Sequence, residues 1–164
     1  NQLIGNGLVL PSGPLRENLN ALSKADIVIV NGERDMSFEE KILKINKNLK
    51  IFYSFYKPKN LEKFKNKKLL ALAGIGNPEN FFQLLERNNL RIEKKIVIPD
   101  HYMFSKNEFI NIINEANINN YQIIMTEKDY FKVKSFSKNK IDFLKVDLII
   151  KNQEKLISVI KEKI

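Results

Sequence analysis

Short apolar runs, rich in β-branched residues, recur along the chain and end at Gly, Pro or Asn. Continuous runs of this kind are typical of strands buried on both faces of a parallel sheet. The predicted strands occupy 25–30, 50–56, 69–73, 92–98, 122–126 and 142–150. Apolar residues at helical spacing lie between them, and we expect helices from about residues 14, 37, 78, 105 and 153. Strands that alternate with helices predict an α/β fold with a mainly parallel sheet and flanking helices.

Three of the predicted helices have start signals. Gly13-Pro14 is typical of a cap and first helical position, which predicts a short amphipathic helix over about 14–23. The segments Ser37 to Glu40 and Ser105 to Glu108 both have the capping-box pattern, in which a hydroxyl and a carboxylate satisfy the first backbone N–H groups.

Length and composition restrict the class of protein. The 164 residues suit one domain of ordinary size, and 43% hydrophobic residues are enough for a core. No apolar stretch approaches the ~20 residues that cross a bilayer, and the first residues lack the layout of a signal peptide, so we expect neither a span nor an export signal. Without cysteine, disulfides, thiolate zinc sites and cysteine nucleophiles are excluded here. Because the chain starts at Asn1, we expect it to be processed or truncated.

The net charge of +9, from 28 basic and 19 acidic residues, favours an anionic partner. Only 4 of the basic residues are Arg, and the Lys residues are spread along the chain. A nucleic-acid binder usually gathers basic residues on one element and uses Arg for bidentate contacts. We therefore expect no nucleic-acid partner.

Ligands of parallel α/β sheets bind where strands end and helices begin. Four segments are predicted to lie at such ends: Asn31-Gly32, Gly74 to Pro78, Asp100-His101 and Thr126 to Asp129. In the second, Gly74-x-Gly76 is similar to the start of a dinucleotide fingerprint, but Glu79 stands where its third glycine would be. A plain loop capped by Asn77 is the favoured interpretation.

His101 is the only histidine, so a metal site with several histidines is excluded. Two interpretations of this residue remain open. It is either an exposed loop residue, or it follows Asp100 into a cleft and moves a proton near neutral pH.

Arg16 and Glu17 form the last candidate site. An arginine can hold a phosphate through two hydrogen bonds, and a glutamate can bind Mg²⁺ directly or through water. The alternative is a charge pair that caps the helix predicted at 14–23. The chain has no GxxxxGK[ST] phosphate loop, no GxSxG and no HExxH.

Several motifs, in order, resemble one enzyme family. They are GNG at 5–7, LPSGPLRE at 10–17, VNG at 30–32, AGIGNPENFF at 73–82, DH at 100–101 and TEKD at 126–129. Together they resemble tetraacyldisaccharide 4′-kinase, the lipid A pathway enzyme of Gram-negative bacteria. The resemblance implies a P-loop NTPase-like kinase that uses ATP and Mg²⁺ to phosphorylate the 4′-hydroxyl of a lipid disaccharide, as a peripheral protein at the cytoplasmic face of the inner membrane.

The resemblance also assigns roles to residues and ranges. Arg16 and Glu17 would lie at the nucleotide, with Glu17 at the metal, and His101 would be the catalytic partner of an aspartate outside this chain. Residues 1–49 would be the C-terminal remnant of the nucleotide-binding domain, 50–68 a linker or hinge, and 69–164 a C-terminal α/β domain. The family's phosphate loop and aspartate base lie in an N-terminal portion, so this chain is expected to be the C-terminal part and inactive alone.

Two other functions stay open on the residues alone. A nucleotide- or polyanion-binding module would need no catalytic base. A basic nucleic-acid-binding domain would show steeply salt-dependent binding.

Overall fold

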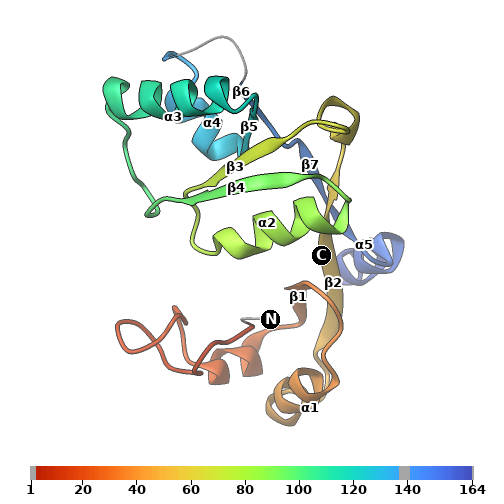
Figure 1. Ribbon diagram of the computed structural model, residues 1–164. Helices are drawn as coiled ribbons and strands as arrows, with labels where there is room; N and C mark the ends of the chain where they lie inside the picture. Colours follow the sequence, from red (N-terminus) through yellow and green to blue (C-terminus); the bar gives the residue numbers. More distant parts are fainter. Residues whose placement is uncertain (1–2, 137–140, 164) are drawn as a thin grey trace. The chain divides into compact units, whose positions relative to one another are not determined.

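The computed structural model describes residues 3–136 and 141–163 (Figure 1). The chain forms two compact units. The first consists of Asn1–Lys57 and Leu148–Ile164, and the second of Pro58–Asp147. These units differ from the predicted domain ranges, because 148–164 belong to the first unit and 50–57 are part of it as well. The chain therefore leaves the first unit and returns to it.

The second unit contains a four-stranded sheet in the order β4-β3-β5-β6. Each neighbouring pair is parallel, as predicted. The strands are β3 (Leu69–Ala73), β4 (Ile92–Val97), β5 (Gln122–Met125) and β6 (Ile141–Phe143). All five residues of β3 are buried, which is why its sequence is apolar without alternation.

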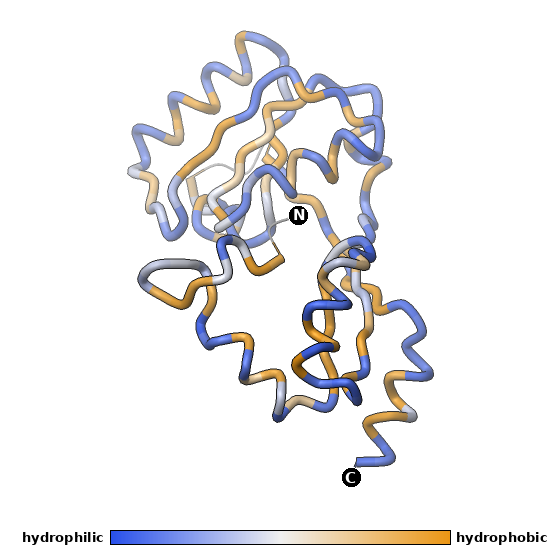
Figure 2. Tube along the Cα trace, turned by 90° about the horizontal axis from the view of Figure 1, so that it is seen from below, coloured by the Kyte–Doolittle hydropathy of each residue, from blue (hydrophilic) through white to orange (hydrophobic). Residues whose placement is uncertain are grey.

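Helices cover both faces of this sheet (Figure 1). On one face, Leu69, Ala71 and Ala73 belong to a core with Phe82 and Leu85 of α2 (Pro78–Arg87). On the other face, Leu70 and Leu72 belong to a second core, which α3 (Lys106–Ile118) and α4 (Glu127–Val133) enter through Phe109, Ala116 and Val133. In Figure 2 the helical turns alternate between hydrophilic and hydrophobic residues, as expected of helices with one face on a core.

The predicted capping box at Ser105 is confirmed. Its hydroxyl accepts from the Glu108 N–H at 3.2 Å, and the Glu108 carboxylate accepts from the Ser105 N–H at 2.8 Å. The box predicted at Ser37 is wrong. Asp35 caps α1 (Met36–Ile45) by accepting from the Phe38 N–H at 3.0 Å. Aspartate is as good an N-cap residue as serine, and Asp35 precedes Ser37 in the chain, so the helix begins earlier than predicted.

The first unit contains β1 (Ile27–Asn31), which pairs in parallel with β2 (Lys50–Pro58). On its other side β2 neighbours β7 (Val146–Ile150), and α5 (Gln153–Lys161) follows. The strand predicted over 142–150 is thus two strands in different sheets. The break comes at Leu144, whose N–H donates to the Met125 carbonyl at 3.1 Å.

The helix predicted over 14–23 is wrong. The backbone of Leu15 forms a bridge with Val9, its N–H donating to the Leu8 carbonyl and its carbonyl accepting from the Leu10 N–H. Only a 3₁₀ helix, η1 (Leu19–Lys24), forms, and the Asn18 side chain caps it. A short η2 (Leu61–Lys63) lies in the basic stretch of the second unit. Among the described residues, no helix is long and apolar enough to cross a membrane.

Candidate functional site

Three loops meet at one edge of the second unit's sheet, because parallel strands end on the same side. They are Gly74 to Asn77 after β3, Pro99 to Ser105 after β4, and Thr126 at the start of α4 after β5. Three of the four predicted segments therefore share an edge. The fourth, Asn31-Gly32, ends β1 in the first unit's sheet.

A buried carboxylate connects two of these loops. Asp129, of which only 1% is exposed, accepts from the Gly74 N–H at 2.8 Å, the Thr126 hydroxyl at 2.7 Å and the Lys132 ammonium at 3.0 Å. Thr126 is also the N-cap of α4 and accepts from the Asp129 N–H at 3.3 Å. We call these four residues the Asp129 network. They fix the end of β3 to the start of α4.

Gly74 is required there because of a close approach. A Cβ at this position would lie 2.6 Å from side-chain carbons of Ile98 and 3.0 Å from Asp129 Oδ1, whereas a Cβ at Gly76 would meet nothing within 4 Å. The Gly74 N–H already donates to Asp129, so it does not point at a phosphate as a dinucleotide fingerprint requires. The structure thus favours the plain loop. Asn77 occupies the N-cap position of α2, but its side chain forms no capping hydrogen bond there.

The second connection involves His101. Asp100 Oδ1 accepts from the His101 N–H at 2.9 Å and from the Lys128 ammonium at 2.7 Å. The hydrogen bond from Lys128 is the main cause that holds the pKa of the Asp100 carboxyl below its usual value, and the His101 N–H acts in the same direction. Lys128 lies in the first turn of α4, so this helix contacts the loop after β4 as well as the loop after β3.

The imidazole of His101 faces solvent. Its side chain is 83% exposed, and Nε2 lies 3.7 Å from Asp100 Oδ2. Its backbone has a φ of +63°, in the left-handed region that residues with a side chain rarely adopt. An imidazole this exposed fits the interpretation of an exposed loop residue, and the described residues form no cleft around it. Asp100 is the one acid among the described residues that pairs with it.

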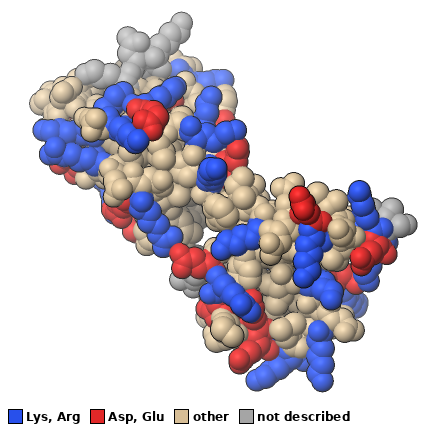
Figure 3. Space-filling model, turned by 90° about the vertical axis from the view of Figure 1, so that its right-hand side faces the viewer, with Lys and Arg blue, Asp and Glu red and all other residues tan. Residues whose placement is uncertain are grey.

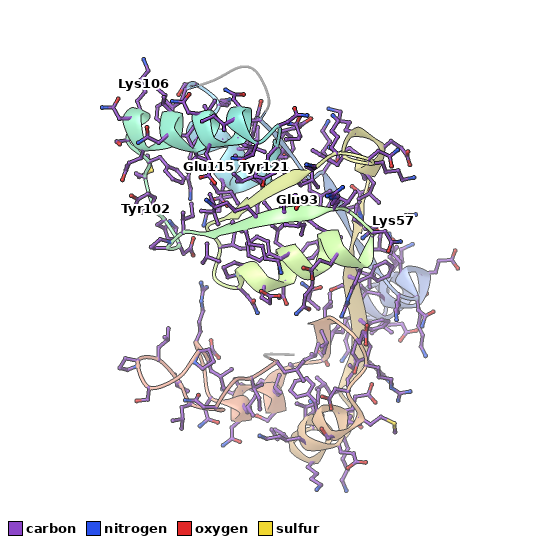
Figure 4. The ribbon with its side chains drawn as sticks, in the orientation of Figure 1. Lys57, Glu93, Tyr102, Lys106, Glu115 and Tyr121 are labelled. Carbon is purple, nitrogen blue, oxygen red and sulfur yellow. The ribbon has the colours of Figure 1, made fainter. Side chains whose placement is uncertain are left out.

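Tyr102 fixes the other side of this loop (Figure 4). Its hydroxyl donates to the Glu108 carboxylate at 2.8 Å, and Glu108 belongs to the capping box of α3. That hydrogen bond raises the pKa of the Tyr102 phenol. His101 is therefore flanked by Asp100, which α4 holds, and Tyr102, which α3 holds.

Arg16 and Glu17 belong to the first unit, whereas these loops belong to the second. They follow a folded loop in which the Asn6 amide donates to the Ser12 carbonyl at 2.9 Å, and both are exposed. No α-helix starts at Arg16, so the helix-capping alternative is wrong.

No group of three or more His, Asp or Glu side chains that could hold a metal ion occurs in residues 3–136 and 141–163. Mg²⁺ is commonly held by one or two carboxylates beside substrate phosphates and water, and the exposed carboxylate of Glu17 fits only that partial role. On the face shown in Figure 3, Lys and Arg are interspersed with Asp and Glu, so the net charge is not gathered in one basic area there.

Comparison with known proteins decides the family. The model of the tetraacyldisaccharide-1-P 4'-kinase family matches residues 1–164. The chain belongs to this family. The family that the motifs resemble is thereby confirmed.

Curated relatives carry the same name. A tetraacyldisaccharide 4'-kinase of Pelagibacter ubique (strain HTCC1062) is 42% identical over 156 residues, which cover 93% of this chain and 50% of the relative. One of Rickettsia bellii (strain OSU 85-389) is 36% identical over 163 residues, covering 99% of this chain and 50% of the relative. The chain spans about half the length of the 4'-kinases it matches.

A solved structure supports the fold. The LpxK of Aquifex aeolicus, described as an "apo" form in complex with ATP, matches 96% of this chain and 48% of its own with a TM-score of 0.61. At 19% identity this likeness shows the α/β fold of a 4'-kinase, and nothing about the ligands of this chain.

Sequence reasoning named His101 and placed the segment Thr126 to Asp129 at a strand end. It missed Tyr102, the pairing of Lys128 with Asp100 and the pairing of Asp129 with Gly74. One signal was available for Asp129. Thr126-x-x-Asp129 directly after a strand is a capping pattern, in which the acid lies near the strand end. The partners across the edge are distant in sequence and have no such signal.

The close approach at Gly74 predicts a difference between two glycines of one loop. Gly74→Ala should lower the free energy of unfolding by about 1–3 kcal/mol, because the methyl group must displace Ile98 and press on Asp129. Gly76→Ala, the matched control, should change it by less than about 0.5 kcal/mol, since open space surrounds that position. Denaturant unfolding of both variants checks this, and equal effects would contradict it.

Proposed function

We propose that this chain is the C-terminal part of an ATP-dependent kinase that phosphorylates the 4′-hydroxyl of tetraacyldisaccharide 1-phosphate in lipid A biosynthesis. The observation that carries the proposal is the family match over all 164 residues. The ATP in the Aquifex aeolicus structure supports ATP as the phosphoryl donor. The lipid disaccharide is the acceptor that the family name implies.

The first unit is proposed to belong to the nucleotide-binding domain, of which residues 1–49 are the C-terminal remnant. Its buried apolar residues are few within the described ranges: Val30, Ile42, Leu49, Phe52 and Leu156. Both hydrophobic clusters lie in the second unit, while Ile29 of β1 and Leu148 of β7 are exposed. A sheet that leaves apolar strand residues in water favours further protein packed on it in the whole enzyme.

Residues 50–68 are proposed as a connection between the domains, and 69–164 as the C-terminal α/β domain, from which 148–164 return to the first unit. The chain crosses between the units at Lys57 and at Asp147, which supports a connection formed by β2 and β7.

His101 is proposed as the catalytic residue of this chain. Its exposed imidazole, at the loop edge of a parallel sheet, would donate a hydrogen bond to, or exchange a proton with, an aspartate base supplied by the rest of the enzyme. The base would take the proton of the 4′-hydroxyl as that oxygen forms a bond to the γ-phosphorus of ATP. The bond from the γ-phosphorus to the oxygen that bridges it to the β-phosphate would break, and ADP would leave.

Arg16 and Glu17 are proposed to act at the nucleotide. The guanidinium of Arg16 would donate two hydrogen bonds to phosphate oxygens, and Glu17 would be one carboxylate ligand of Mg²⁺. When bound, the ion neutralises phosphate charge. The enzyme is proposed to be peripheral at the cytoplasmic face of the inner membrane.

The proposal predicts activity for the whole enzyme and none for residues 1–164 alone. In the whole enzyme, His101→Ala should lower kcat by a factor of ~10²–10⁴ with the KM for ATP nearly unchanged, because a proton-transfer partner acts in the transition state. The assay follows ³²P from γ-labelled ATP into the 4′-position of the disaccharide.

If the parent enzyme transfers no phosphate to the disaccharide but still binds ATP or polyanions, the kinase function is wrong and the protein is a binding module. Turnover by residues 1–164 alone would contradict the view that the base lies elsewhere. An unchanged kcat in His101→Ala, with a lower melting temperature, would return His101 to a loop role.

A second prediction concerns Glu17. Glu17→Gln should raise the Mg²⁺ concentration needed for half-maximal activity by about 10-fold, because an amide is a neutral and weaker ligand for a hard cation. Glu40→Gln, an exposed acid of the same unit, is the matched control and should leave it unchanged. If both variants have the same Mg²⁺ dependence, Glu17 is not a ligand of the metal ion.

A further inference from the structure

The backbone of His101 is held in an unfavourable conformation. Its φ of +63° lies in the left-handed region, where a side chain meets the backbone, and such positions persist only when their surroundings fix them. Glycine would adopt this conformation without strain, yet the chain has histidine. The contacts that hold the His101 backbone therefore also determine where its imidazole lies.

The Asp100 carboxylate supplies one of these contacts. Its Oδ1 accepts from the N–H of His101, the next residue, and thereby stabilises the turn at that residue. The same oxygen accepts from the Lys128 ammonium at 2.7 Å. The ion pair with Lys128 thus adds a second, side-chain restraint on the orientation of this carboxylate, beside the His101 N–H.

Lys128 can act as an anchor because α4 is itself fixed. Asp129, the next residue, is buried and bound to the Gly74 N–H at the end of β3. Thr126 caps the same helix. The position of Lys128 is thus tied to the central strand of the sheet, 28 residues from the Asp100 that it binds.

We propose that Lys128 is a positioning residue, which orients His101 by holding the Asp100 carboxylate against the His101 N–H. The expected effect on catalysis rests on the proposed kinase function, whereas the contact between Lys128 and Asp100 does not depend on that function. Tyr102 restrains the other side of the loop through Glu108, so loss of Lys128 should release His101 without unfolding the segment.

Kinetics of the whole enzyme test the effect on His101. Lys128→Met should lower kcat by about 10-fold or more with the KM for ATP unchanged, since a displacement of about 1 Å at a reacting group costs up to ~10²-fold. Lys128→Arg, which keeps the charge and a donor, should recover most of the rate. Asp100→Asn should lower kcat similarly, and the double variant should be no slower than either single variant, because both remove one connection.

Lys94→Met is the matched control. Lys94 forms an ion pair with Glu115 of α3, labelled in Figure 4, and the exposure of this pair closely matches that of Lys128 and Asp100. It lies in the same unit, within β4 and not in the loop that carries His101. Its loss should leave kcat unchanged.

A spectroscopic measurement tests the contact independently of activity. In the enzyme labelled with ¹⁵N-histidine, the His101 amide signal is assigned by its loss in His101→Ala. Lys128→Met should shift or broaden this signal and speed its exchange with solvent about 10-fold, as Asp100→Asn does, while Lys94→Met leaves it in place.

The outcomes separate the two proposals. An unchanged amide signal in Lys128→Met, or additive losses of kcat in the double variant, would overturn the positioning role. A parent enzyme without kinase activity, in which Lys128→Met still changes the amide signal, would overturn the proposed function and support the contact.

Discussion

The carboxylate of Asp129 is the constraint on which the arrangement of the loop edge depends. It is almost completely buried, and it accepts hydrogen bonds from a backbone N–H, a hydroxyl and an ammonium, so that its charge is compensated on every side that the structure describes. A buried charge that loses a partner is costly, about 3–5 kcal/mol, although the complete group adds little net stability compared with an apolar one. Its physical effect is therefore geometric. It sets where α4 starts relative to the end of β3.

The rest of the edge follows from that position. With α4 fixed, Lys128 reaches Asp100 in the loop after β4, and Asp100 holds the backbone of His101 in its left-handed conformation. The close packing of Gly74 on Ile98 and Asp129 leaves no space for a side chain at the end of β3. The core of the second unit supports this edge, whereas the few buried apolar residues of the first unit fit a portion of a larger domain. The chain belongs to the 4'-kinase family and spans about half the length of the relatives it matches.

Elements with strong local signals were predictable from the sequence. The strand 69–73 is apolar throughout and ends at Gly74, and the capping box at Ser105 satisfies its own backbone, so neither depends on distant residues. The helix expected over 14–23 failed because Leu15 pairs with Val9, a contact that helical periodicity does not reveal.

The site was predictable only in part, for the same reason. His101 could be found as the sole histidine at a strand end. Gly74, one of the partners of Asp129, lies 55 residues away from it in the sequence, and only the folded sheet brings the two together. A pattern of apolar spacing gives the order of strands and helices, but it does not give the side chain that fixes one loop to another.

Amide hydrogen exchange at Gly74 tests most directly whether Asp129 organises the edge. The neighbouring amide of Ile98, which donates to the Ala73 carbonyl at 3.0 Å, serves as an internal reference for unfolding of the whole unit. In Asp129→Ala, exchange at Gly74 should accelerate at least ~10-fold more than exchange at Ile98, because a local hydrogen bond is lost. Equal acceleration at the two amides, or none at Gly74, would contradict it.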